Sequence, residues 1–461
     1  MEKLQVIVHG FGVRLLYKGR VAKMLTVAKF GGSSLSNRAQ FEKVKGIVKD
    51  DDNRKIVVVS ALGKREKSDS KMTDLLFLIA AHIKHDVNYD SLWDVIVSRF
   101  VSVKAELKLN YDIEADLADL RRNLDAGKIT EDHLVSRGEY FTAKLVSEYL
   151  GYEFVDAREV IAFKANGDID LDVCKERLEK RIVENSQVVV PGFYGAFVNG
   201  KIKLLNRGGS DITAAIIASC LGADKYENWT DVNGVLMADP RIVDNPVPVA
   251  QLTYEELSEL SYMGANVLHE ETIYPIRGLN IPIHIKNTND PTATGTIISD
   301  MMTEPRGEIA GISGKQNFIA INIFKNKMST EVGFLKRTLA IFERFHLNIE
   351  HVPTGIDHVG IILAEKEVGD NLYDLIEALQ TELGADDVTY KEKLSLITIV
   401  GRGIIANAHV QGVVFSTLGN AQIRVQLIAQ SPREINMIIG VHNDDYVRAI
   451  SSLYDGLTDI W

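Results

Sequence analysis

The sequence predicts an α/β protein, an αβα sandwich with a mostly parallel central sheet, followed by a smaller α+β region. Apolar strand candidates alternate with helical patterns up to about residue 300, and shorter strands and helices follow. With 461 residues, 46% of them hydrophobic and 25% charged, the chain has the composition of a globular protein. Its length predicts about two to four domains.

The predicted strands of the large region are short apolar runs separated by helical patterns. They lie at Leu25–Ala28, Ile56–Ser60, Gln187–Val190, Lys225–Trp229 and Pro282–Lys286. Asn199-Gly200 stands between alternating residues, which is a strong signal for a β-hairpin. We therefore expect an antiparallel piece in the otherwise parallel sheet. The turn-rich stretch Thr288–Thr296 closes this region, which we bound at 24–300.

The remaining region, about 306–461, contains a weak internal repeat. Five of its residues recur at one constant offset: Gly333, Leu339, Phe342, Leu347 and Ile349 recur as His409, Phe415, Leu418, Ile423 and Val425. Two unrelated apolar helices produce such matches by coincidence. Because strand and helix positions share the offset, a duplicated strand–helix–strand unit is the better explanation.

Charge and cysteine content exclude several classes of protein. The formal net charge of −11 argues against a nucleic-acid binder and requires any anion site to be locally positive. The only cysteines, Cys174 and Cys220, indicate a reducing, cytoplasmic setting. No apolar stretch is long enough to span a bilayer, so we expect no membrane contact. Residues 1–23 precede the first convincing strand, and we assign them no function.

Two glycine-rich stretches lie where helices begin. Lys29-Phe30-Gly31-Gly32-Ser33 follows the first strand, but its lysine precedes the glycines, unlike that of a P-loop. Arg207-Gly208-Gly209-Ser210-Asp211 repeats the arrangement, with a cation in front and a carboxylate behind. Either stretch alone is more often a plain turn. Together, two helix starts that present backbone N–H groups beside Lys29 and Arg207 predict a phosphate-handling site.

Six motifs in series resemble those of the aspartate kinases in the amino-acid kinase superfamily. Between Met24 and Thr296 they read, in the family's order, KFGGSS, SRGE, RGGSDIT, TDVNGV, ADPR and, further on, GANVLHEETI. The duplicated tail is similar to the paired ACT domains that follow in this family. The resemblance implies the amino-acid kinase fold and two ferredoxin-like ACT domains. The first, about 318–392, is inserted into the second, about 306–317 plus 393–461.

The family carries out ATP-dependent phosphorylation of the L-aspartate side chain to 4-phospho-L-aspartate, with Mg²⁺, on the route to lysine, threonine and methionine. This reaction suits the residues, because a carboxylate is ionised at neutral pH and needs no general base. Two unit charges about 4 Å apart repel by roughly 4 kcal/mol at an effective dielectric near 20. The enzyme must therefore mainly neutralise and align the two anions.

The resemblance also assigns residues to roles. The catalytic residues are Lys29, Asp211, Gly31, Gly32 and Arg207. The substrate-binding residues are Ser60, Thr73, Glu139, Phe193, Arg207 and Ser210. The ATP-binding residues are Lys29, Gly31, Gly32, Ser33, Gly208, Gly209, Thr230, Asp231 and Arg241. No side chain is assigned to a metal, since phosphates and water would hold most of the Mg²⁺ shell. The sequence departs from the family at Leu236 and Asn266, on the adenine side.

In the tail, the resemblance implies a site for an amino-acid effector. Its residues are Met328, Glu331, Gly333, Phe334, Leu335, Asn348, Ile349 and Glu350. We expect feedback inhibition by lysine, with or without threonine, and a homodimer or dimer of dimers formed through the ACT domains. Residue by residue, an amphipathic helix with a polar start explains this segment equally well.

Two other functions remain open from the sequence. One is a kinase of the same fold with a different acceptor, as in the glutamate and carbamate kinases. The other is a non-catalytic amino-acid sensor. Glu139, Arg207 and the tail favour aspartate as the acceptor, while Lys29 and Asp211 argue against a sensor.

Overall fold

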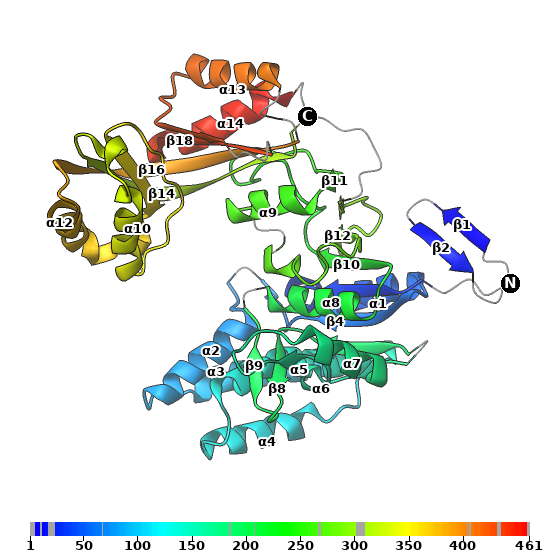
Figure 1. Cartoon of the computed structure of the whole chain (residues 1–461). Helices are drawn as coiled ribbons and strands as arrows, with labels where there is room; N and C mark the ends of the chain where they lie inside the picture. Colours follow the sequence, from blue (N-terminus) through cyan, green and yellow to red (C-terminus); the bar gives the residue numbers. More distant parts are fainter. Residues whose placement is uncertain are drawn as a thin grey trace. The chain divides into compact units, whose positions relative to one another are not determined.

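The computed structural model forms two compact units (Figure 1). The first unit is Met1–Val235 with Leu268–Met301, and the second is Leu236–Val267 with Met302–Trp461. The structure describes the backbone of residues 5–9 and 12–16, and residues 24–458 except 67, 184–185, 207, 266–267, 269, 301–308, 403, 405–406 and 431–434.

The first unit contains most of the helices and a large sheet. Its elements are β1 (Gln5–His9), β2 (Gly12–Leu16), β3 (Thr26–Phe30), η1 (Gly32–Leu35), α1 (Arg38–Asp50), β4 (Arg54–Val59), α2 (Met72–Lys84), α3 (Asp90–Leu107), α4 (Ile113–Asp125), α5 (Glu131–Leu150), β5 (Glu153–Phe154), α6 (Ala157–Val160), β6 (Ala162–Phe163), α7 (Leu171–Arg181), β7 (Val188–Pro191), β8 (Tyr194–Phe197), β9 (Ile202–Leu204), α8 (Gly209–Cys220), β10 (Lys225–Thr230), η2 (Glu270–Thr272), β12 (Ile283–Asn287) and β13 (Thr296–Ile298).

The central sheet of the first unit has the strand order β13-β12-β10-β3-β4-β7-β5. Its pairs are parallel except that of β12 with β13. The five predicted strands coincide with β3, β4, β7, β10 and β12, and the mostly parallel sheet is confirmed. Strands β4 and β7 are largely apolar runs because both faces of the sheet are covered by helices.

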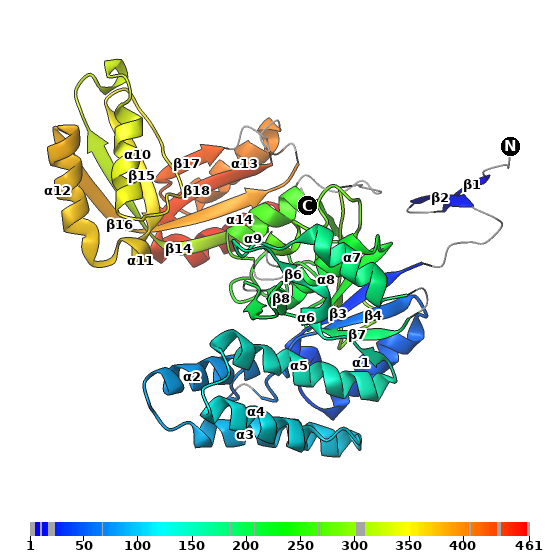
Figure 2. The ribbon, with the colours of Figure 1, turned by 60° about the horizontal axis from the view of Figure 1, so that its bottom comes forward.

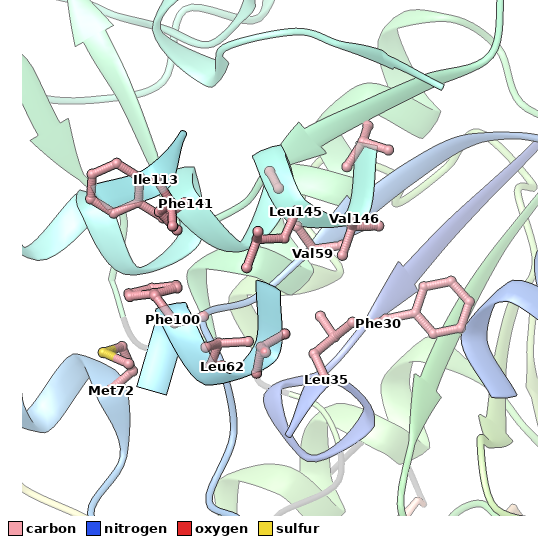
Figure 3. Close-up of a cluster of buried hydrophobic side chains, with 14 of the residues drawn as sticks. Phe30, Leu35, Val59, Leu62, Met72, Phe100, Ile113, Phe141, Leu145 and Val146 are labelled. Atoms are coloured by element: carbon pink, nitrogen blue, oxygen red, sulfur yellow. The ribbon is translucent and has the colours of Figure 1, made fainter. Parts of the chain in front are cut away.

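One face of this sheet packs on α1 to α5 around a large apolar cluster. Figure 3 shows part of this cluster, in which Phe30 and Val59 of the sheet join Phe100, Phe141 and Leu145 of the helices. Helices α7 and α8 contact each other, and α8 contacts β3 and β10 on the opposite face of the sheet (Figure 2). Because side chains alternate along a strand, the residues of β3 that point away from the cluster point towards α8.

The hairpin predicted at Asn199-Gly200 forms between β8 and β9. It belongs to a separate sheet of order β6-β8-β9, so its predicted place in the main sheet is wrong. The turn signal is local and does not identify the sheet that a hairpin joins. The antiparallel strand of the main sheet is instead β13. Near the N-terminus, β1 and β2 form a further antiparallel pair.

The second unit is built on an antiparallel sheet of order β15-β14-β16-β18-β17. Helices α10 and α12 contact each other beside one part of this sheet, and α13 and α14 do so beside another (Figure 1). Its elements are β11 (Gln251–Leu252), α9 (Tyr254–Tyr262), β14 (Gly311–Phe324), η3 (Met328–Thr330), α10 (Phe334–Arg344), β15 (His358–Ala364), α11 (Glu365–Val368), η4 (Gly369–Asn371), α12 (Leu372–Leu383), β16 (Asp387–Val400), α13 (Ala408–Asn420), β17 (Leu427–Gln430), β18 (Asn436–His442), η5 (Asn443–Asp445) and α14 (Tyr446–Gly456).

The two copies of the internal repeat contain equivalent helices of this unit, α10 and α13. The offset that relates Leu339 to Phe415 also relates Arg344, the last residue of α10, to Asn420, the last residue of α13. Strands β14 and β16 pair along both halves: Ile312 faces Ile399 near one end, and Phe324 faces Asp387 at the other. The two halves therefore share one continuous sheet.

Residues 236–267 lie within the predicted catalytic region of 24–300, yet they pack in the second unit. Helix α9 contacts β14 and β16. The Ser313 hydroxyl donates hydrogen bonds to the backbone carbonyls of Met263, at 2.8 Å, and Leu260, at 3.3 Å. Among the described residues, no helix is long and apolar enough to cross a membrane.

Candidate active site

A cavity of about 1060 Å³ opens in the first unit where β3, β4 and β10 end. The carboxyl ends of parallel strands are the usual place for a ligand in an open α/β sheet. The predicted site residues that line it are Lys29, Gly31, Gly32, Ser33, Ser60, Thr73, Glu139, Phe193, Gly208, Gly209, Ser210, Asp211, Thr230 and Asp231. Arg207 and Asn266 lie outside the described residues. Arg241 belongs to the second unit, where it pairs with Asp239 at 2.5 Å.

Lys29 and Asp211 form an ion pair at the edge of this cavity. The Nζ of Lys29 lies 2.6 Å from Oδ1 of Asp211, and Lys29 is only 7% exposed. Asn228 joins them: its Nδ2 donates to Asp211 Oδ1 at 2.9 Å, and its Oδ1 accepts from Lys29 Nζ at 3.4 Å. Asn228 is opposite Lys29 in the pairing of β10 with β3. Sequence reasoning missed Asn228, because the strand also contains Lys225 and Glu227 and nothing in the local sequence singles the asparagine out.

The turn formed by Gly31, Gly32 and Ser33, the first turn, is tightly packed. It leads into the short 3₁₀ helix η1, and α1 begins only at Arg38. The N–H of Gly31 donates to the carbonyl of Trp229 at 3.0 Å. A Cβ on Gly32 would lie 2.9 Å from the carbonyl oxygen of Ala61. The first turn therefore needs glycine at 32 because another backbone approaches it there.

The turn formed by Gly208, Gly209 and Ser210, the second turn, leads directly into α8. Gly208 is the N-cap, with a φ of 80° that favours glycine. Asp211 lies in the first turn of α8, where a carboxylate is favourable. A Cβ on Gly209 would lie 2.5 Å from the ring of Phe193. Phe193 itself has a φ of 77°, which is rare for a bulky residue and frequent at functional sites.

Glu139 is a buried carboxyl group that lines the cavity. It is 4% exposed, and burial raises its pKa to about 8. The backbone N–H of Ala61 and the charge of Arg137 act in the opposite direction but do not outweigh burial. Among the described residues, Oε2 has no hydrogen-bond partner. A buried acid with a free oxygen at a cavity is suited to receive a cationic group.

The predicted effector residues lie in the second unit, at the two ends of α10. The group at its N-terminal end is Met328, Glu331, Gly333, Phe334 and Leu335. Met328 and Phe334 are buried in an apolar cluster. The Glu331 carboxylate pairs with Lys325 and Arg337. This end of the helix therefore presents Gly333, with a φ of 81°, and the exposed Leu335.

The other group follows the C-terminal end of α10. Asn348 and Ile349 line a cavity of about 520 Å³ together with Leu339, Glu343, His346 and Leu347. The Oε2 of Glu350 accepts a hydrogen bond from the hydroxyl of Tyr262 at 2.6 Å. Glu350 thus contacts helix α9, in the segment that packs with the second unit.

Comparison with known proteins agrees with this architecture. Residues 24–287 match the amino acid kinase family, and residues 397–457 match an ACT domain. Aspartokinase 3 of Bacillus subtilis is 36% identical over 444 residues, which cover 93% of this chain and 98% of that protein.

Solved structures agree as well. The crystal structure of Clostridium acetobutylicum aspartate kinase, an allosteric enzyme, is 39% identical, with a TM-score of 0.85 over 95% of this chain and 100% of that one. Escherichia coli aspartokinase III, solved with aspartate and ADP, is 24% identical and shares the fold, with a TM-score of 0.76 over 94% and 99% of the two chains. The predicted fold, an α/β kinase domain with an antiparallel α+β ACT region, is confirmed. The chain belongs to the aspartate kinases, ATP-dependent phosphotransferases of the amino-acid kinase family.

Proposed function

We propose that this enzyme transfers the γ-phosphoryl group of ATP to the side-chain carboxylate of L-aspartate in the cavity of the first unit. The product is 4-phospho-L-aspartate, and an amino acid bound to the second unit inhibits its formation. The observation that carries the proposal is the Lys29–Asp211 ion pair, whose atoms lie 2.6 Å apart between two glycine-rich turns.

On the phosphate side, Lys29 neutralises the group in transfer. Asp211 and Asn228 hold its ammonium in place, so that the charge is positioned before the substrates arrive. The N–H groups of Gly32 and Ser33, and those of Gly209 and Ser210 at the start of α8, receive the phosphate oxygens. Thr230 and Asp231, at the end of β10, lie on the nucleotide side.

On the acceptor side, Glu139 receives the α-ammonium of aspartate. Arg207 forks onto a carboxylate, a role that remains a prediction. Ser60, Thr73, Phe193 and Ser210 line the cavity around the acceptor. A bound ammonium favours the ionised form of Glu139, so aspartate binding releases a proton from this group near neutral pH.

Magnesium fits this site as a companion of ATP. Among the described residues, no group of three or more His, Cys, Asp or Glu side chains is placed to hold a metal ion. Phosphate oxygens and water would therefore supply most of its ligands, as Mg²⁺ prefers. When bound, the ion offsets negative charge on the phosphates.

Lysine, with or without threonine, is the proposed effector. Escherichia coli aspartokinase III, which shares the fold, has been solved with lysine and aspartate in a T state. The 11 residues of α10 put about 16 Å between the two groups of predicted effector residues. One amino acid cannot span that distance, so a site that uses both groups needs two copies of the chain. This favours the predicted homodimer or dimer of dimers. The cytoplasmic setting stays a prediction from two free, buried cysteines.

The test is formation of aspartyl hydroxamate from aspartate, ATP, Mg²⁺ and hydroxylamine by the full chain. We expect turnover with aspartate, little with glutamate, and inhibition by lysine or threonine. Preference for glutamate would establish a different acceptor. Binding of aspartate without turnover would establish a sensor, and insensitivity to both amino acids would refute the proposed regulation.

A further inference from the structure

Arg99 is a buried cation outside the cavity lining. It comes from α3 and is 2% exposed. Its Nη2 donates to the carbonyl of Gly63, and its Nη1 donates to the carbonyl of Ser70 at 2.8 Å. Nη2 also lies 3.6 Å from the carboxylate of Asp69. Among the described residues, these polar contacts all fall within eight residues of one loop.

Helix packing alone does not explain a charge at this position. The neighbours of Arg99 on the buried face of α3 are Ile96, Phe100 and Val103, which belong to the apolar cluster. Burial of a guanidinium is costly, and here it lowers the pKa of Arg99 despite the opposing effect of Asp69. A backbone carbonyl that is removed from water on folding needs a hydrogen-bond donor, and Arg99 supplies this donor to the loop. The charged group of Arg99 therefore stabilises the loop and not the packing of the helix.

That loop runs from Ser60 to Lys71, and α2 begins at Met72. With the first two residues of α2 it forms the segment called the Ser60–Thr73 loop, which contacts both sides of the proposed active site. Gly63 packs so closely against the first turn that a Cβ on Gly63 would lie 2.0 Å from the carbonyl oxygen of Gly32. The N–H of Ala61 donates to the carboxylate of Glu139. Ser60 and Thr73 line the cavity at the two ends of the loop. The carbonyl of Gly63 is thus fixed by Arg99 beside the first turn.

We propose that Arg99 is a positioning residue for phosphoryl transfer. It holds the Ser60–Thr73 loop so that Gly63 supports the first turn and Ala61 reaches Glu139, without touching either substrate. This inference rests on the proposed function for its kinetic consequence. Its structural consequence, an ordered Ser60–Thr73 loop, is measurable without any substrate.

Arg54 provides a matched control. It is also buried, at 8% exposed, and pairs with Glu227 at 2.6 Å while donating to the carbonyl of Ile47 at 2.6 Å. It begins β4, whereas the cavity opens where β4 ends. Its guanidinium also lies over the ring of Trp229, 5.3 Å from the ring centroid, and neither Arg54 nor any of these three partners lines the cavity. Loss of Arg54 removes the donor to the Ile47 carbonyl and one partner of the buried Glu227, which keeps Lys225 and Trp229. Loss of Arg99 removes the donor to the carbonyls of Gly63 and Ser70, so both losses should lower stability. Only loss of Arg99 should disturb the loop.

The experiment compares Arg99→Met, Arg99→Lys and Arg54→Met in the full chain. We expect Arg99→Met to raise the KM for aspartate about tenfold and to lower kcat by on the order of 10²-fold, because misplacement of about 1 Å has such effects. Arg99→Lys, which keeps a charge but donates from a single point, should recover part of the loss. Arg54→Met should keep both constants within about twofold of those of the unmodified enzyme, although both Met variants unfold at lower urea.

Amide hydrogen exchange separates this inference from the proposed function. Faster exchange within Ser60–Thr73 is expected in Arg99→Met and not in Arg54→Met, whether or not aspartate is the acceptor. Unchanged exchange and kinetics in Arg99→Met would overturn the inference, as would equal effects from Arg54→Met. If Arg99→Met does not fold, the same comparison between Arg99→Lys and Arg54→Met decides. An inactive unmodified enzyme refutes the proposed function and leaves the exchange result to decide the role of Arg99.

Discussion

The first turn, Gly31–Ser33, passes into a short 3₁₀ helix, whereas the second turn, Gly208–Ser210, is the direct start of α8. Gly32 is needed for space, because a Cβ there would lie 2.9 Å from the carbonyl oxygen of Ala61. Gly208 is needed for its backbone, since its φ is 80°. Gly32 and Gly208 thus need glycine for different physical reasons, although Gly209 beside Gly208 is also packed tightly, and substitutions at 32 and 208 should distinguish the two reasons.

The largest expected effect comes from the ion pair that joins the two turns. Lys29→Met removes the cation beside the first turn and should lower kcat at least about 10³-fold, as loss of a charge on a transferring phosphoryl group does. Asp211→Asn should cost less, because Asn228 still contacts Lys29. Hydroxamate formation measures both. Lys45→Met, a change on α1 outside the cavity lining, should retain activity. Activity that survived Lys29→Met would refute the assigned role.

A second prediction separates the two adjacent glycines of the first turn. Gly32→Ala should lower kcat on the order of 10²-fold, because the turn and the Ser60–Thr73 loop must move apart. Gly31→Ala should change kcat only a few-fold. Its Cβ would meet Lys29 Nζ and the Trp229 carbonyl oxygen at 3.6 Å, an ordinary contact, and its φ is −70°. Steady-state kinetics of the two variants test this. Equal losses would contradict the assigned reason, the close approach of the Ala61 carbonyl oxygen to position 32.

Glu139 provides a third prediction, because the first turn and the acid share a neighbour in Ala61. The acid has a pKa of about 8 in the free enzyme and must ionise to receive an ammonium. The KM for aspartate should therefore fall about tenfold per pH unit between pH 6 and 8 and level off above. The KM for ATP should not follow this slope. Glu139→Gln should abolish the slope and raise the KM for aspartate.

Glu139 also determines the direction in which its contribution to stability changes with pH. Its pKa is raised in the folded chain from an ordinary value of 4.5, so between these values the folded state keeps a proton that the unfolded state has lost. Its contribution to the free energy of unfolding is therefore full below about pH 4.5 and disappears as pH rises to about 8. Urea midpoints should show this trend in the unmodified enzyme and lack it in Glu139→Gln. A midpoint difference between them that stays constant over this range would contradict the burial effect.

The contrast between the turns also marks what the sequence can predict. Short, largely apolar runs such as β4 and β7 are typical of buried parallel strands, and all five predicted strands coincide with observed ones. Glycines beside helix starts located both turns. The need for glycine at position 32 was not predictable. It comes from the close approach of Ala61 and Gly63, which are distant in the sequence, so only the folded structure shows it.

Three further features lay beyond sequence reasoning for the same reason. Asn228 and Arg99 each lie among other polar residues of their strand or helix, so the local sequence does not single them out until their partners are known. Helix α9 has an ordinary amphipathic pattern, which does not tell whether the kinase sheet or the regulatory sheet receives its apolar face.

The smallest expected effect concerns the second turn. Gly208→Ala forces a side chain into a left-handed conformation and should lower the free energy of unfolding by about 1–2 kcal/mol. Gly208→Asn should cost less, because asparagine tolerates this conformation. Since both variants add a Cβ at the same place, their difference should reflect how well each residue tolerates the left-handed conformation. Urea unfolding measures it, and kcat should stay within about threefold in both. If the two variants were equally unstable, or if Gly208→Ala lost as much kcat as Gly32→Ala, position 208 would depend on space as position 32 does.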